Sequence, residues 1–91
     1  MNSKRRKALE GILDKIADMK SMLDDVKDEL ENVKSDEEDA YENMPDGMKY
    51  SERGETAENA VSNLEEAVDA LDECVSQLDD IPELIEEAMG A

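Results

Sequence analysis

The chain has 91 residues, of which 27 are acidic and 10 basic, so its formal net charge at neutral pH is −17. It has one Cys and no His, which excludes an intrachain disulfide, a Cys-based zinc site and the usual neutral-pH proton shuttle. Leu, Ile and Val together number only 17, a composition typical of disorder unless the spacing of apolar residues argues otherwise.

The first element that the sequence predicts is a long amphipathic helix over about residues 3–43. Apolar side chains recur every seven residues, on the heptad positions called a and d. Position a holds Leu9, Ile16, Leu23, Leu30 and Met44, and position d holds Ile12, Met19, Val26, Val33 and Ala40. Glu37 is the single break, at an a position. A repeat of 3.5 residues predicts a left-handed supercoil with a partner helix.

A turn is expected next, over about residues 44–50. Pro45 disfavours helix in the residue before it, and Pro45-Asp46-Gly47 has turn chemistry. Ser51 is then predicted to cap the following helix by accepting a backbone N–H bond. We expect Tyr41 and Tyr50, which flank the turn, to cover the open end of the helices.

A second helix is expected over about residues 51–89. Its a positions hold Leu or Ile, its e positions mostly Val, and its d positions mostly small residues, among them Cys74, which we interpret as part of the core. Pro82 lies inside this repeat. We expect a kink or a restart near residues 79–82, where Asp80 and Glu83 provide the pattern of a capping box.

These elements predict an all-α fold with one domain, an antiparallel two-helix hairpin over residues 1–91. Because the added e position widens the apolar stripe beyond one neighbour, we expect the hairpin to form a homodimeric four-helix bundle. A lone hairpin with a wet flank is the alternative. No apolar run is long enough to span a membrane and no apolar signal segment follows the basic start, so we expect a soluble cytoplasmic protein.

Charge is divided unevenly along the chain. Residues 1–34 contain eight basic and eight acidic side chains, whereas residues 35–91 contain two basic and 19 acidic ones. Three lysines recur at position e of the first helix, where they flank the seam and are expected to face acidic neighbours: Lys20, Lys27 and Lys34.

The basic cluster Lys4–Lys7 begins the first helix, where the helix dipole disfavours positive charge. In an antiparallel hairpin we expect it to be neutralised by the acids near the end of the second helix, Glu83, Glu86 and Glu87. A contact with phosphate or nucleic acid and a frayed helix end are the alternatives.

The outward b, c and f positions of the second helix form the candidate binding surface. Five carboxylates within residues 65–73 give about one charge per 2.7 Å, compared with about one per 1.7 Å in duplex DNA. Such an anionic rod would repel nucleic acid but fits a basic, nucleic-acid-binding protein surface; a purely solubilising role is the alternative. The candidate partner-binding residues are Glu58, Glu65, Glu66, Asp69, Asp72, Glu73, Asp79 and Asp80.

The turn adds possible partner contacts at Tyr41, Asp46, Tyr50 and Arg53, although Arg53 is also expected to pair with an acid nearby. No catalytic, cofactor-binding or metal-binding residue is predicted. Exposed carboxylates lack a pocket that would separate their proton affinities, and the spacing of a calcium-binding loop is missing. We therefore expect a binding protein and not an enzyme.

The segment Tyr41-Glu-Asn-Met-Pro-Asp-Gly-Met-Lys-Tyr-Ser-Glu-Arg-Gly-Glu55, followed by acidic Ala/Leu/Val repeats, resembles a group of short phage and prophage proteins of Gram-positive bacteria. The resemblance covers about residues 36–80 and carries over no site residue. It implies a small accessory protein made in an infected bacterial cell. Some phage proteins of this size and acidity resemble DNA in charge and block host nucleases, so the resemblance implies an anti-defence inhibitor.

Two other functions are compatible with the sequence. The first is a structural or assembly protein that binds its partner through the apolar stripe instead of the acids. The second is a sponge for small phosphorylated signals, which would use Lys4–Lys7 across a dimer.

Overall fold

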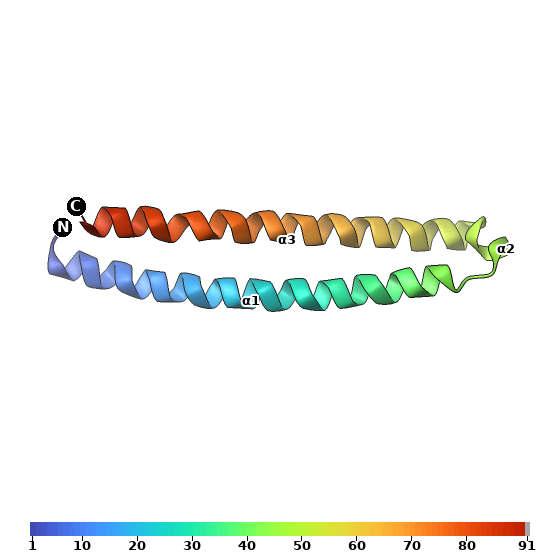
Figure 1. Cartoon of the computed structure of the whole chain (residues 1–91), viewed down its shortest axis with the longest axis horizontal. Helices are drawn as coiled ribbons and strands as arrows, with labels where there is room; N and C mark the ends of the chain where they lie inside the picture. Colours follow the sequence, from blue (N-terminus) through green and yellow to red (C-terminus); the bar gives the residue numbers. More distant parts are fainter. Residues whose placement is uncertain (91) are drawn as a thin grey trace.

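The computed structural model describes residues 1–90, and the regular structure of this part is helical throughout. Helix α1 spans Ser3–Glu42, α2 spans Asp46–Lys49 and α3 spans Glu52–Gly90. The two long helices lie side by side and run in opposite directions, with α2 at one end of the molecule (Figure 1). The predicted all-α class is confirmed.

The molecule is a thin rod. Its principal extents are 69 × 15 × 13 Å and its radius of gyration is 20.5 Å, whereas a compact chain of this length would have a radius of gyration of about 12 Å. Its accessible surface is 6801 Å², compared with about 5300 Å² for a compact monomer of this mass. The two long helices therefore leave an unusually large surface uncovered.

Helix α1 begins and ends where local chemistry favours it. The Asn2 side chain accepts a hydrogen bond from the Arg5 backbone N–H at 2.9 Å, which caps the first turn. At the other end the Asn43 N–H donates to the Asp39 carbonyl at 3.0 Å, and the chain leaves the helix before Pro45.

The connection between the long helices contains one helical turn, α2. The N–H groups of Met48 and Lys49 donate to the Pro45 carbonyl at 2.8 and 3.1 Å. The Ser51 hydroxyl donates to the Met48 carbonyl at 2.5 Å, so it satisfies the end of α2. Ser51 directly precedes α3, and its carbonyl accepts a hydrogen bond from the Glu55 N–H at 3.1 Å. Its hydroxyl bonds to α2 instead of accepting from α3, so the predicted side-chain cap is wrong.

Gly54 makes the close approach of α2 to α3 possible. It is one of only two buried residues in the described part of the chain, the other being Val68 at 6% exposure. A Cβ at Gly54 would overlap the main chain of Lys49. Glycine at this position therefore lets the connection pack against the first turn of α3.

Helix α3 runs through Pro82 without a break, so the predicted restart near residues 79–82 is wrong, and Figure 1 shows no sharp bend there. Proline lacks the N–H for one backbone hydrogen bond and costs about 3 kcal/mol inside a helix. The continued packing of Ile85 and Met89, both half-buried, favours keeping the helix intact beyond it.

The seam between α1 and α3 is formed by positions a and e of both helices, instead of a and d as predicted for the first. The half-buried a and e residues of α1 are Leu9, Leu13, Ile16, Lys20, Leu23, Lys27, Leu30, Lys34, Glu37 and Tyr41. Opposite them lie Val61, Leu64, Val68, Leu71, Val75, Leu78, Ile85 and Met89 of α3. Long lysine stems cover apolar surface while their ammonium groups stay in water, which explains why a lysine-bearing row faces the partner helix.

The d positions of α1 are consequently exposed. Ile12, Met19, Val26 and Val33 expose between 42 and 52% of their surface. On α3, Cys74 is also exposed, so its predicted place in the core is wrong for the single chain. An apolar row that the sequence assigns to a seam thus faces solvent in the helix pair.

Candidate functional site

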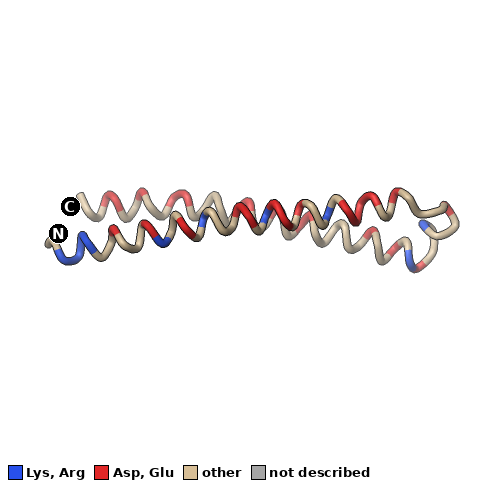
Figure 2. Tube along the Cα trace, turned by 90° about the horizontal axis from the view of Figure 1, so that it is seen from below, with Lys and Arg blue, Asp and Glu red and all other residues tan. Residues whose placement is uncertain are grey.

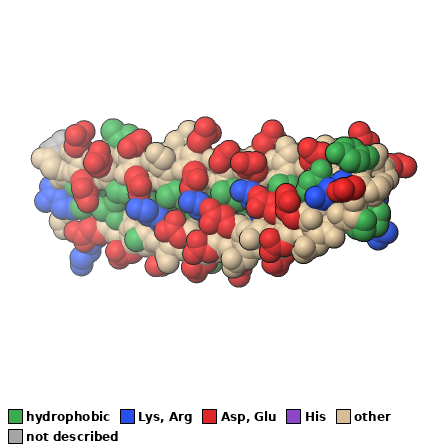
Figure 3. All heavy atoms as spheres, turned by 45° about the vertical axis from the view of Figure 1, so that its right-hand side comes forward, with side chains coloured by type: hydrophobic (Ala, Val, Ile, Leu, Met, Phe, Trp, Pro, Cys, Tyr) green, Lys and Arg blue, Asp and Glu red, His purple; other side chains and the backbone are tan. Residues whose placement is uncertain are grey.

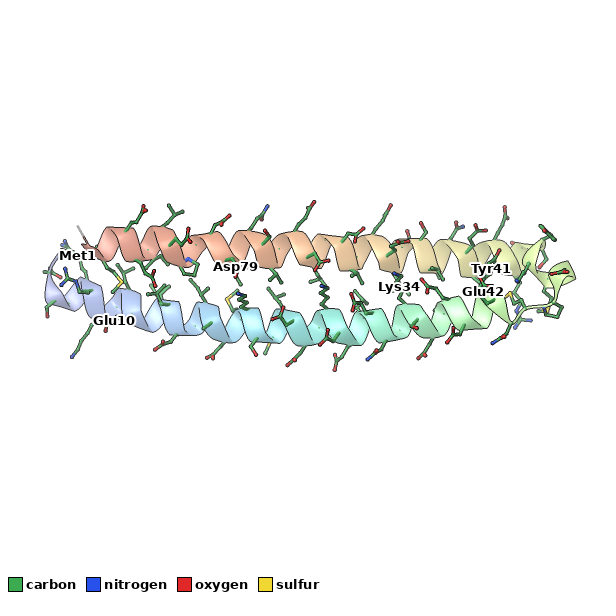
Figure 4. The ribbon with its side chains drawn as sticks, in the orientation of Figure 1. Met1, Glu10, Lys34, Tyr41, Glu42 and Asp79 are labelled. Atoms are coloured by element: carbon green, nitrogen blue, oxygen red, sulfur yellow. The ribbon has the colours of Figure 1, made fainter. Side chains whose placement is uncertain are left out.

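The three seam lysines of α1 face acidic neighbours, as the sequence predicts, and two of them pair with carboxylates of α3. Lys20 forms an ion pair with Asp79, and the Lys27 ammonium lies 2.5 Å from an Asp72 oxygen. Figure 4 shows Asp79 on the side of α3 that faces α1. Lys34 instead lies 3.7 Å from Glu38 of its own helix.

These contacts raise the pKa of both lysines. For Lys20 the hydrogen bond to Asp79 is the main cause, followed by the charge of the same carboxylate. For Lys27 the hydrogen bond to Asp72 raises the pKa, although partial desolvation opposes it. The ammonium form of each side chain is therefore favoured by the paired helices.

The acidic surface predicted on α3 is divided by these ion pairs. Asp72 and Asp79, two of the eight predicted partner-binding carboxylates, are held by lysines within the chain. The other six form no ion pair within residues 1–90: Glu58, Glu65, Glu66, Asp69, Glu73 and Asp80. Figure 2 shows that basic segments belong mostly to α1, whereas α3 is acidic along its length.

The acids of one row gather on a single side of the rod, which we call the b face. Position b flanks the a/e seam on one side of each helix, and position d flanks it on the other. Because the two helices are antiparallel and meet through the same positions, both b rows lie on one side of the rod. The b face comprises Glu10, Ala17, Asp24, Glu31 and Glu38 of α1 with Glu58, Glu65, Asp72, Asp79 and Glu86 of α3. Nine of these ten residues are acidic and all ten are exposed.

The same geometry brings the two d rows together on the opposite side, which we call the d face. It comprises Ile12, Met19, Val26, Val33 and Ala40 of α1 with Ala60, Ala67, Cys74, Ile81 and Ala88 of α3. None of these ten residues is charged, and eight of them are exposed. Figure 3 shows a different face of the rod, on which Lys or Arg side chains alternate with apolar ones between rows of acidic side chains.

An apolar groove marks the middle of the d face. Its volume is about 280 Å³, and it is lined by Met19, Met22, Leu23, Val26, Cys74 and Leu78. Met22 borders it with 68% of its surface exposed. Because residues of both long helices line it, the groove confirms that the two d rows share one side of the rod.

The turn residues predicted as contacts have different surroundings. The Lys49 ammonium lies 5.4 Å from the centre of the Tyr41 ring, and Figure 4 shows Tyr41 close to the turn. Tyr50 is 92% exposed, so it does not cover the end of the helices as predicted. Asp46 begins α2, and Arg53 forms no ion pair within the described residues, contrary to expectation.

A second hollow, of about 590 Å³, lies beside the turn and is open to solvent. Glu37 and Arg53 line it together with Met44, Ala57 and Ala60. Glu37 is the one acidic residue at an a position of α1, and the short side chains of Ala57 and Ala60 are among those that line the hollow with it. The break in the heptad at Glu37 therefore lies beside this hollow.

The basic cluster at the start of α1 lies by the end of α3. The Arg6 guanidinium donates a hydrogen bond to the Met89 carbonyl at 2.9 Å. The contact is thus with a helix C-terminus, which attracts positive charge. The expected ion pairs with Glu83, Glu86 and Glu87 are not formed by the described residues.

Other kinds of site are not found in the part of the chain that the structure describes. No three His, Cys, Asp or Glu side chains converge there as metal ligands would. Neither long helix contains a stretch apolar enough to cross a bilayer. No protein-family model, curated protein or solved structure matches this chain.

Proposed function

We propose that this chain is a non-enzymatic assembly protein, in which the helix pair persists as a hairpin and two copies join through their d faces into a four-helix bundle. The observation that carries the proposal is the uncharged d face with its apolar groove. A monomer would leave this apolar surface in water. Contiguous apolar patches on soluble proteins usually mark an interaction site, so we expect a partner to cover it.

The amount of uncovered surface supports the same conclusion. The chain exposes about 1500 Å² more than a compact monomer of its mass, and about 800 Å² per partner is enough for a stable interface. Burying the d faces against each other would also enclose Cys74, Ile81 and Val26 in one bundle core, as residues at a and d positions are enclosed in other bundles.

The single thiol offers a direct test. Cys74 is exposed in the lone chain and lies on the d face, so we expect association to shield it. The measurement is the rate of reaction of Cys74 with a soluble disulfide reagent over a range of protein concentrations. Slower reaction at high concentration, relative to the unfolded chain in urea, is the expected result.

The control is a second cysteine at an exposed position on the b face, Ala17→Cys, in a chain whose native thiol is removed by Cys74→Ser. This thiol should react quickly at every concentration, because the b face stays in water. If Cys74 reacts as quickly as Cys at position 17 at all concentrations, the d face is not an interface and the proposal is wrong.

A second candidate function uses the acids. We propose that the bundle presents its outward carboxylates to a basic surface of a nucleic-acid-binding protein, for example a host nuclease. The observation that favours it is that six predicted carboxylates of α3 have no ion pair within residues 1–90. They remain available for charge-assisted contacts with lysine and arginine.

Competition with DNA tests this second function. The probe is a purified DNA-binding nuclease with a labelled duplex, from which the acidic protein should displace the duplex at low salt but not at high salt. The test variant neutralises four carboxylates of α3: Glu65→Gln, Glu66→Gln, Asp69→Asn and Glu73→Gln. The control neutralises the same number in α1: Glu10→Gln, Asp14→Asn, Asp18→Asn and Asp25→Asn. If both variants lose competition equally, net charge alone explains the displacement of the duplex, and the proposed role of the α3 carboxylates is wrong.

A further inference from the structure

We infer that the second copy docks with its α3 against α1 of the first, and with both turns at the same end of the bundle. This arrangement rests on the proposed d-face assembly and specifies it. Two hairpins that meet face to face have two symmetric choices. A two-fold axis along the rod places α1 over α3, whereas an axis across the rod places like helices over one another and the turns at opposite ends.

The sizes of the d-face side chains favour α1 over α3. On α1 the d row is mostly large, with Ile12, Met19, Val26 and Val33. On α3 the d row is mostly small, with alanine at positions 60, 67 and 88 and Cys74 between them. In the register that places Val26 over Cys74, a large side chain of one copy meets a small one of the other at three of the five levels, whereas Met19 meets Ile81 and Ala40 meets Ala60. Like over like would crowd one side of the bundle and leave a gap on the other.

Charge favours the same choice. Helix α1 carries 13 acidic and eight basic residues, a net charge of −5. Helix α3 carries 13 acidic residues and one basic residue, a net charge of −12. With α1 over α3, each of the two contacts between the copies joins a helix of charge −5 to one of charge −12. With like over like, one contact joins two helices of charge −5 and the other joins two of charge −12, and the summed repulsion is larger.

The axis along the rod also preserves the register of the groove. The groove residues Val26 and Cys74 come from facing levels of the two helices. Rotation about the long axis keeps every residue at its own height, so the Val26 side chain of each copy comes to lie over Cys74 of the other. The two grooves are then filled by each other's Met19, Met22 and Val26 side chains.

The experiment measures distances between spin labels by pulsed electron resonance. One label is placed at the turn with Gly47→Cys and another, in a separate protein, near the opposite end with Gly11→Cys, both in a Cys74→Ser background. A Cβ at either glycine has no neighbouring atom within 4 Å, so both positions leave space where a side chain can begin. We expect each protein to give a short distance between its two labels, comparable with the width of a bundle.

The outcomes separate this inference from the proposed assembly. Long distances at both sites, towards the 69 Å length of the rod, would show a dimer with turns at opposite ends; the inferred arrangement would then be wrong and the d-face assembly would stand. The absence of any dipolar signal, together with a monomeric mass, would overturn both.

Discussion

The two sides of the helix pair are built from the same repeat but carry opposite chemistry. The b face has nine acidic residues in ten positions, and lysines of the seam reach across to two of them. The d face has no charge in ten positions and an apolar groove at its centre. One side is suited to water or to a basic partner, and the other to apolar contact.

This difference shows which residues the seam between α1 and α3 does not use. In a pair held by positions a and e, the residues at d are not needed for pairing, so selection for solubility would favour polar residues there. They are apolar instead, from Ile12 to Ile81. The proposed second copy would cover them.

The largest expected effect comes from placing a charge on the d face. Val26→Glu would bury two carboxylates in a symmetric dimer, so we expect the dissociation constant to rise about a hundredfold or more, equivalent to about 2.7 kcal/mol. Sedimentation velocity measures the loss of dimer. Ala17→Glu adds the same charge to the b face and should leave the dimer nearly intact; equal disruption by both would remove the distinction between the faces.

The next largest effect tests how the turn packs against α3 within a single chain, a contact that involves neither the b face nor the d face. Gly54→Ala forces a Cβ against the Lys49 main chain, and we expect a loss of about 1–3 kcal/mol in the free energy of unfolding. Gly11→Ala, where a Cβ meets nothing within 4 Å, should raise it by roughly 0.5–1 kcal/mol. Urea unfolding measures both, and a neutral Gly54→Ala would show that the turn does not pack as described.

Alkaline pH tests the ion pairs beside the b face. The paired helices raise the pKa of Lys20 and Lys27 above the ordinary lysine value of 10.5. The stability that these pairs contribute is therefore complete below about pH 10.5 and is lost as the pH rises through the higher folded-state pKa. We expect the melting temperature to fall in this range.

Removing the two ammonium groups should weaken that pH dependence. The variant Lys20→Met with Lys27→Met keeps apolar stems in the seam, whereas Lys15→Met removes a lysine that forms no ion pair in residues 1–90. A melting temperature that falls equally in both variants and in the natural chain would indicate general repulsion instead of these two contacts.

The smallest effect concerns the net charge. At −17 the chain repels itself, so added sodium chloride should raise the melting temperature modestly by screening the acidic rows. A decrease with salt would mean that the attractive pairs at Lys20 and Lys27 outweigh repulsion between the acids. Thermal unfolding followed by circular dichroism at several salt concentrations distinguishes these results.

Much of the architecture could be predicted from the heptad spacing, because apolar periodicity dictates helix type and length. Pro45 with Gly47 located the connection, although the single turn of α2 has no signature in so short a segment. The continuity of α3 through Pro82 depends on packing against α1, which a local rule about proline does not include.

The choice of seam could not be predicted in the same way. Both a/d and a/e stripes are present in the sequence, and their competition is decided by how lysine stems and facing valines fit together. The four-residue step from Leu9 to Leu13 was the available signal for e, as was the valine row of α3. Likewise, the ion pairs of Asp72 with Lys27 and of Asp79 with Lys20 depend on the register of the two helices, which the sequence does not give.

The molar mass of the natural chain in solution tests the central claim most directly. Light scattering during size-exclusion chromatography, repeated over a wide range of loading concentrations, reports this mass independently of the elongated shape. The d-face interface predicts twice the chain mass of 10.2 kDa at high concentration. A folded, helical species that keeps the mass of one chain at every concentration would contradict it.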